Sequence, residues 1–111
     1  MVKVIALLKK RDGMTQEEFS RYWEEQHGPL VRRVFPEVER YVQNHLVDPP
    51  RGEGPQIDGV AEVWYKDQQA WRAAVDFYTS EEGRVIRDDE RKFIDVSRMI
   101  VLVSEEKVIK P

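Results

Sequence analysis

The sequence predicts an α+β domain with the ferredoxin-like element order β-α-β-β-α-β and one antiparallel sheet. Three observations predict this class. Short runs rich in Val, Ile and Leu are typical of strands, and two intervening segments carry apolar residues at helical spacing. Pro and Gly cluster between these runs and mark turns. A length of 111 residues fits one domain with one modest core, so we expect a single domain over residues 1–111.

The first half of the chain is expected to contain a strand, an interrupted helix and a second strand. The first strand covers residues 2–10 and ends before an Asp-Gly turn. Thr15 is the expected N-cap of the helix, because Glu18 three residues later completes a capping box. Pro29 removes a backbone donor, so we expect a break or kink there and then a short second helical piece. The second strand is expected over residues 38–47.

The second half repeats the pattern after a loop rich in Pro and Gly at residues 48–58. A third strand is expected over residues 59–66, and Asp67 is a suitable N-cap for the helix that follows. A shorter helix is expected over residues 81–89. The last strand is expected over residues 97–103, after which a charged tail either adds an edge strand or covers a partner.

The sheet is expected to be apolar on both faces. The first strand presents Val4 and Leu8 on one side and Ile5 and Leu7 on the other, and the last strand repeats this pattern. Helices cover only one face of a ferredoxin-like sheet, and large exposed apolar patches mark interfaces. We therefore expect a homodimer with sheets stacked face to face and a pocket between sheet and partner. The alternative is that the C-terminal tail folds back over the patch.

Composition excludes several classes of function. The net charge is −3 and no long basic run occurs, which argues against nucleic acid or an anionic membrane as partner. No cysteine is present, which excludes disulfides, iron–sulfur clusters and thiol nucleophiles. No apolar stretch approaches the ~20 residues needed to span a bilayer, and the first residues do not resemble a signal peptide. A cytoplasmic protein without metal or other cofactor is therefore expected.

Two histidines are the first candidates for catalysis, because histidine titrates near neutral pH. His27 lies at the end of the first helical stripe, where it acts either in catalysis or as a helix C-cap. His45 lies on the second strand, where it is either catalytic or a solvated edge residue. Glu62 in the middle of the third strand either lines a pocket or pairs with a nearby Lys or Arg.

The other candidates are aromatic and amide side chains. Tyr41 and Gln43 share a strand face with the second histidine, so they are candidates for contacts to a substrate oxygen. Asn44 is a weaker candidate because it points to the opposite face. Trp23 and Trp64 are expected either to wall the pocket or to pack in the core.

Several segments resemble the EthD family. Residues 19–31 (FSRYWEEQHGPLV) resemble its F-x-x-Y-W-x-x-x-H-x-P-L-V signature. The stretches RYVQNH (40–45), DGVAEVWYKD (58–67) and DDERKFID (88–95) resemble its second strand, its third strand and the segment before its fourth strand. Together they cover most of the chain in the expected order.

The resemblance implies a dimeric α/β barrel but does not define a reaction. Similar barrels include isomerases, polyketide cyclases and haem-degrading or quinol-forming monooxygenases. In the isomerase-type relatives, one histidine at the helix break and another on the second strand act in proton transfer, which would correspond to His27 and His45. Tyr41 would orient an oxygen of the substrate.

Three hypotheses follow. The first is a cofactor-independent enzyme that moves protons on a hydrophobic cyclic or aromatic-derived compound, in a catabolic or polyketide pathway, or a component of ethyl tert-butyl ether degradation. Its reaction would be isomerisation, lactone rearrangement, cyclisation or dehydration. The second is a non-catalytic dimer that binds or carries a hydrophobic metabolite. The third is a haem-degrading or quinol-type monooxygenase, of which the haem-degrading kind would bind haem.

Overall fold

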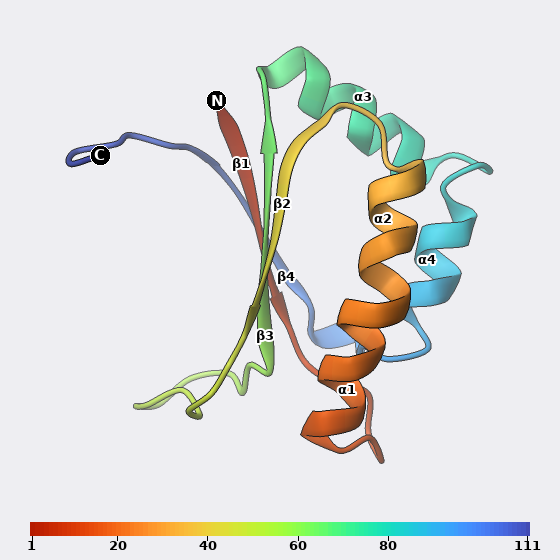
Figure 1. Cartoon of the computed structure of the whole chain (residues 1–111), viewed down its shortest axis with the longest axis vertical. Coiled ribbons are helices and arrows are strands. Elements are labelled where there is room, and N and C mark those ends of the chain that lie inside the picture. The colour runs from red at the N-terminus through yellow and green to blue at the C-terminus, as the bar shows by residue number, and fades with distance from the viewer.

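The fold consists of two layers, in which helices cover one face of a four-stranded antiparallel sheet (Figure 1). A computed structural model describes residues 1–111. The sheet order is β2-β3-β1-β4, and all three strand pairs are antiparallel. This order confirms the predicted ferredoxin-like α+β fold. The strands are β1 (Val2–Leu8), β2 (Val38–His45), β3 (Gly59–Tyr65) and β4 (Ile100–Glu105).

The first helical segment begins as predicted but does not break at the proline. Thr15 caps α1 (Gln16–Tyr22) through the reciprocal capping box with Glu18. A π-helical turn (Trp23–His27) follows, and α2 (Gly28–Val34) continues from it without a gap (Figure 1). The proline lies in the first turn of α2, where its missing N–H is tolerated. The predicted interruption is therefore a local widening of one continuous helix.

The second helical segment of the chain contains α3 (Gln68–Thr79) and α4 (Arg84–Glu90). The Asp67 side chain accepts a hydrogen bond from the Ala70 N–H at 2.8 Å, which confirms the predicted cap. The last strand starts later than predicted, because Val96–Arg98 form a 3-10 turn whose N-cap is the preceding aspartate. No helix in the chain is both long enough and apolar enough to cross a bilayer.

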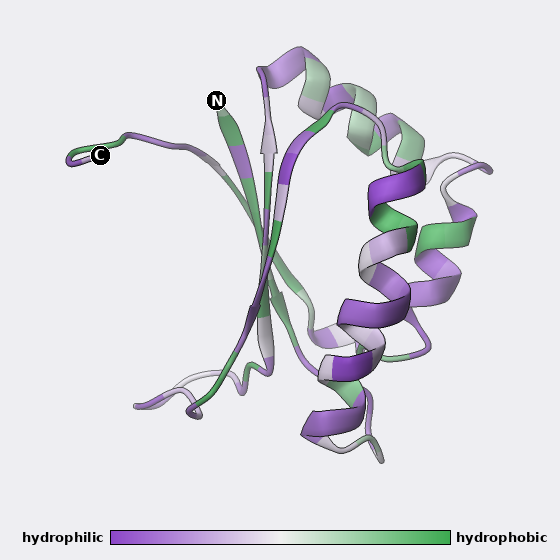
Figure 2. Cartoon of the chain, in the orientation of Figure 1, coloured by the Kyte–Doolittle hydropathy of each residue, from purple (hydrophilic) through white to green (hydrophobic).

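An aromatic cluster fills the core beneath the first helix. Phe19, Trp23 and Phe93 are fully buried, and the Phe19 ring centroid lies 5.7 Å from that of Trp23 and 5.6 Å from that of Phe93. Figure 2 shows hydrophobic residues along the sheet, where these rings pack. Because the cluster joins α1, the segment after α4 and the sheet, it sets the position of the π-helical turn.

A substitution at Gly59 tests how tightly this cluster is packed. A Cβ atom at Gly59 would lie 2.6 Å from Cζ3 of Trp23, closer than real carbon contacts allow. We expect Gly59→Ala to destabilise the fold by about 1–3 kcal/mol through overpacking. Urea unfolding would measure the loss. Introducing the same change into a Trp23→Phe background should cost less, because the smaller ring leaves room; an equal cost in both backgrounds would contradict the packing argument.

The outer face of the sheet carries a polar network beside exposed apolar residues. The Lys3 ammonium lies 2.5 Å from the Glu62 carboxylate and 3.1 Å from that of Glu106, and the Trp64 indole N–H donates to Glu106. Ile100 and Leu102 of β4 point to this face and are exposed. Their exposure shows that the face is not covered within one chain.

The C-terminal tail does not cover this patch. Figure 1 shows the tail leaving the body on the side of the sheet opposite the helices. Val108 and Ile109 are exposed, Ile109 almost completely at 92%, and neither belongs to a strand. The alternative in which the tail folds back over the outer face, and the one in which it adds an edge strand to its own sheet, are therefore both wrong.

Candidate active site

A cavity of about 230 Å³ lies between the sheet and the helices of the same chain. Its floor includes Val4, Ala6 and Leu8 from the inner side of β1, and its walls come from all the α-helices except α1. Val75 and Val101 line the cavity and are 41% and 52% exposed, so its mouth lies between α3 and β4. This position corrects the expectation of a pocket between the sheet and a partner.

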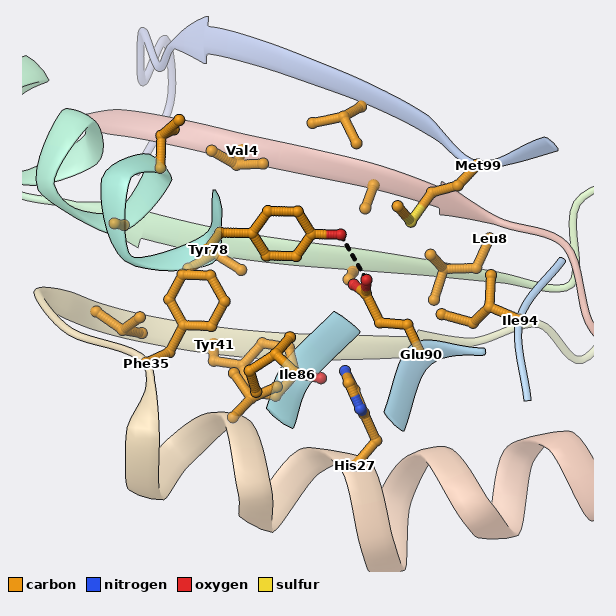
Figure 3. Close-up of a pocket in the computed structure, with 18 of the residues that line it drawn as sticks. Val4, Leu8, His27, Phe35, Tyr41, Tyr78, Ile86, Glu90, Ile94 and Met99 are labelled. Carbon is orange, nitrogen blue, oxygen red and sulfur yellow. Dashed lines mark hydrogen bonds between the residues drawn. The ribbon is translucent and has the colours of Figure 1, made fainter. Parts of the chain in front are cut away.

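The lining is almost entirely hydrophobic, with a few polar groups. Figure 3 shows His27, Tyr41, Tyr78 and Glu90 around the same space. They come from the π-helical turn, β2, α3 and α4 respectively. A few convergent polar groups in an apolar cavity are typical of a small-molecule site.

His27 is buried, and one of its ring nitrogens is fixed by a carboxylate. Nδ1 lies 2.8 Å from Oδ2 of Asp89, which accepts the Nδ1–H. The neutral ring therefore has Nε2 as its unprotonated nitrogen. Burial lowers the pKa of His27, and the Asp89 contact opposes this shift only in part. The imidazole is thus a neutral base at pH 7, and the predicted alternative of a ring that caps helix carbonyls is wrong.

Asp89 is itself held in place by a second aromatic side chain. The Tyr22 hydroxyl donates to Oδ1 of Asp89 at 2.5 Å, and burial together with this bond raises the pKa of Tyr22 to about 12. Phe93 packs on the His27 ring with centroids 4.8 Å apart. The dyad of His27 and Asp89 therefore has little freedom to rotate.

Sequence reasoning missed Asp89, Tyr22 and Glu90. The available signal was a carboxylate on an apolar stripe, because Ile86, Asp89 and Phe93 follow one another at spacings of three and four residues. A buried position in that stripe requires a hydrogen-bonding partner for the carboxylate. The identity of the partner could not be read from the chain, because Asp89 and His27 are 62 residues apart.

A hydrogen-bond chain connects His45 to Tyr41 through Gln43. The Gln43 amide donates to the Trp23 carbonyl and to the Tyr41 hydroxyl, each at 2.9 Å. Since that carbonyl only accepts, the Gln43 oxygen must face His45, 2.8 Å from Nε2. His45 therefore carries its proton on Nε2, and Nδ1 faces the Ser20 hydroxyl at 3.0 Å.

This chain leaves Tyr41 as a donor toward the cavity. Its oxygen accepts from Gln43, so its own proton is free for another acceptor. His45 does not line the cavity; its ring stacks on Trp23 with centroids 4.6 Å apart. The structure thus brings His27, Tyr41 and Trp23 to the cavity and leaves His45 and Gln43 behind them.

Glu62 and Trp64 do not join this group. Strand alternation places them on the outer face of β3, where Glu62 binds Lys3, as one of the predicted alternatives had it. The cavity instead meets Ala61, Val63 and Tyr65. This corrects the expectation that Glu62 and Trp64 share a pocket with Tyr41. No three His, Asp or Glu side chains are grouped closely enough to hold a metal ion.

Solved structures show the same fold over nearly the whole chain. A protein of the EthD family from Bacillus halodurans C-125 is 25% identical, with a TM-score of 0.71 over 96% of this chain and 99% of that one. A dimeric protein of unknown function and ferredoxin-like fold from Bacteroides fragilis NCTC 9343 is 13% identical, with a TM-score of 0.64 over 95% of each chain. A hydroxynitrile lyase from Passiflora edulis is 12% identical, with a TM-score of 0.68 over 99% of this chain and 96% of that one.

The family comparison agrees with these structures. No curated protein matches the chain. The family model for the EthD domain matches residues 11–97, which contain the π-helical turn, β2, β3 and the two later helices. Because the match spans most of the chain and includes both His27 and Asp89, this protein belongs to the EthD family.

Proposed function

We propose that this chain is a cofactor-independent enzyme that removes and returns a proton on a small cyclic compound with a carbonyl oxygen. The observation that supports this proposal most strongly is the buried dyad of His27, which lines a mainly apolar cavity, and Asp89, whose carboxylate fixes the His27 ring. A neutral imidazole whose tautomer is fixed by a carboxylate is the arrangement that a general base requires.

The other groups of the cavity suit the same reaction. As Nε2 of His27 accepts a proton from the carbon next to the carbonyl, negative charge moves to the carbonyl oxygen. The Tyr41 hydroxyl, already accepting from Gln43, donates to that oxygen. The Asp89 carboxylate stabilises the imidazolium that forms, and the low polarity of the cavity strengthens these interactions.

The size of the cavity limits the substrate to a compact molecule. A cavity of roughly 150 Å³ is large enough to hold benzene. The space of about 230 Å³ therefore suits one ring with short substituents. It is smaller than the roughly 300–1,000 Å³ of sites for drug-sized ligands, so it does not fit a porphyrin, and the haem hypothesis receives no support.

Hydrogen–deuterium exchange tests the proposed function without knowledge of the natural substrate. Single-ring carbonyl compounds such as 3-cyclohexen-1-one and α-angelica lactone would be incubated with the protein in D₂O and followed by NMR. We expect exchange at the carbon next to the carbonyl that depends on His27. If these compounds raise the melting temperature but show no catalysed exchange, the carrier hypothesis replaces the enzyme.

We also infer that the protein acts as a homodimer through the outer face of the sheet. The exposed Ile100 and Leu102 lie beside the polar network of Lys3 and Glu62, and a structural relative of the same fold is described as dimeric. Sedimentation analysis should show a dimer that Leu102→Asp dissociates, because the charge would be buried in the interface. The exposed Val85→Asp on α4 is the matched control and should leave the dimer intact.

A further inference from the structure

We infer that Glu90 is a second proton carrier in the cavity, so that a proton removed at one substrate carbon is replaced at another. The inference rests on the proposed function, in which His27 is the first carrier. It specifies the substrate class as a cyclic β,γ-unsaturated carbonyl compound, in which one saturated carbon separates the carbonyl group from the double bond. The reaction is then a shift of that double bond rather than simple exchange.

The first argument is the position of Glu90 and its lack of a cationic partner. Glu90 lines the cavity from α4, and the Tyr78 hydroxyl donates to its Oε1 at 2.5 Å (Figure 3). The neighbouring cations are engaged elsewhere: Arg87 donates to the carbonyls of Tyr78 and Ser80, and Arg91 pairs with the exposed Asp88. A carboxyl group in an apolar cavity without a counter-ion is costly when ionised.

The second argument is the electrostatic surroundings of this carboxyl group. Burial raises the pKa of Glu90, the adjacent Asp89 carboxylate acts in the same direction, and Tyr78, Arg91 and Arg87 oppose the shift. From the facing strand, Tyr41 presents a neutral hydroxyl, and its own pKa is raised by burial and by Glu90. Glu90 is therefore a neutral acid over a wider pH range than an exposed glutamate, while the buried imidazole is a neutral base.

The step is balanced with these two groups. In 3-cyclohexen-1-one, the C2–H bond breaks, its proton goes to Nε2 of His27, and its electrons form a dienolate whose oxygen accepts from Tyr41. The Glu90 O–H bond then breaks and its proton goes to C4, which gives 2-cyclohexen-1-one. The imidazolium returns its proton to the Glu90 carboxylate through water after the product leaves. No oxidant or reductant is needed.

Glu90→Gln separates this inference from the proposed function. The amide keeps the size of the side chain and its oxygen still accepts from Tyr78, but it has no acidic proton. We expect the ratio of conjugated-ketone formation, followed by its absorbance, to C2 exchange, followed by NMR, to fall about 10²–10⁴-fold in this variant. Unchanged ketone formation, or equal loss of both activities, overturns the inference. Absence of C2 exchange in the wild type overturns the proposed function instead.

Stability without substrate supplies an independent readout. A raised pKa in the folded state adds stability that is complete below the unfolded-state value and is lost as pH rises through the folded-state value. Wild type should therefore lose this stability as the pH is raised from 5 to 8, whereas Glu90→Gln should not. The melting temperature of Glu90→Gln minus that of wild type should increase over this range. The exposed Glu82→Gln is the matched control and should show a constant difference. A constant difference for Glu90→Gln as well overturns the inference, whether or not any substrate is turned over.

Discussion

His27→Asn is expected to reduce catalysed exchange at C2 of 3-cyclohexen-1-one by about 10²–10⁴-fold, the contribution of a positioned general base. The variant removes the only imidazole that lines the cavity. The amide N–H of asparagine can still donate to the Asp89 carboxylate, but the side chain cannot take a proton from carbon. Binding of the ketone, measured by calorimetry, should change little because the cavity is mainly apolar. Wild-type exchange rates in this variant would contradict the role of His27.

Asp89→Asn should cause part of the same loss of catalysed exchange, on the order of 10²-fold. The loss should appear in kcat and leave KM nearly unchanged. An amide that donates to Nδ1 of His27 would leave the proton on Nε2, where the base is needed. The neighbouring Asp88→Asn is a matched control, because Asp88 is exposed and forms its ion pairs with Arg84 and Arg91. Equal activities of the two variants would exclude the orienting role of Asp89.

The pH dependence follows from the same dyad. Burial lowers the pKa of His27 from 6.5. The neutral base and the activity should therefore persist at pH values below 6.5, and the activity should fall only when the pH drops below the lowered pKa. As the pH falls, the imidazole of His27 is protonated at a higher pH in the unfolded state than in the folded state. Stability should therefore decrease as pH falls from 6.5 through the folded-state pKa. His27→Asn should remove this decrease, which thermal unfolding between pH 7 and pH 5 would reveal.

Phe93→Ala is expected to cost about 3–5 kcal/mol of folding free energy, the range for removing a fully buried aromatic ring. The Phe93 ring contacts Phe19, Tyr22 and His27, so the cavity that it leaves cannot collapse without moving the site. Because small domains have only about 5–15 kcal/mol in total, the variant will be close to unfolding at moderate urea concentrations.

Urea unfolding of Phe77→Ala supplies the comparison for this prediction. Phe77 lies on α3, is only half-buried and packs edge-on against Phe35. We expect its removal to cost clearly less than the removal of Phe93. Phe93→Leu should fold but show weakened C2 exchange, because the flat surface that holds the His27 ring is lost. Equal free-energy losses for the two alanine variants would show that the aromatic cluster is not the main core.

Local features of the chain predicted most of the secondary structure. The capping box at Thr15 and the cap at Asp67 depend only on residues three positions apart, and both form as expected. The errors also have local causes. Pro29 was tolerated because it falls in a first helical turn, and the last strand was delayed by a 3-10 turn capped by the Asp95 side chain.

The candidate site was predicted only in part. Which strand residues line the cavity depends on which face of the sheet the helices cover, and the sequence does not specify that face. Alternation along the strands groups Tyr41 with Gln43 and His45, and Glu62 with Trp64, but cannot say which group meets the cavity. Tyr41 pairs with Val63, and both line the cavity, whereas Glu62 pairs with Val42 on the opposite face. Trp23 then covers His45, so only one of the two histidines reaches the cavity.

The sequence by itself determined the α+β class and the order of strands and helices, and it predicted an apolar patch on the outer face and His27 as a candidate for the site. These depend on periodicity, caps and hydrophobicity, which are properties of neighbouring residues. Only the tertiary structure decided that Asp89 orients His27 and that Tyr78 and Glu90 enter the same cavity. Those contacts join residues up to 62 positions apart, and no local rule specifies which distant side chain satisfies a buried polar group.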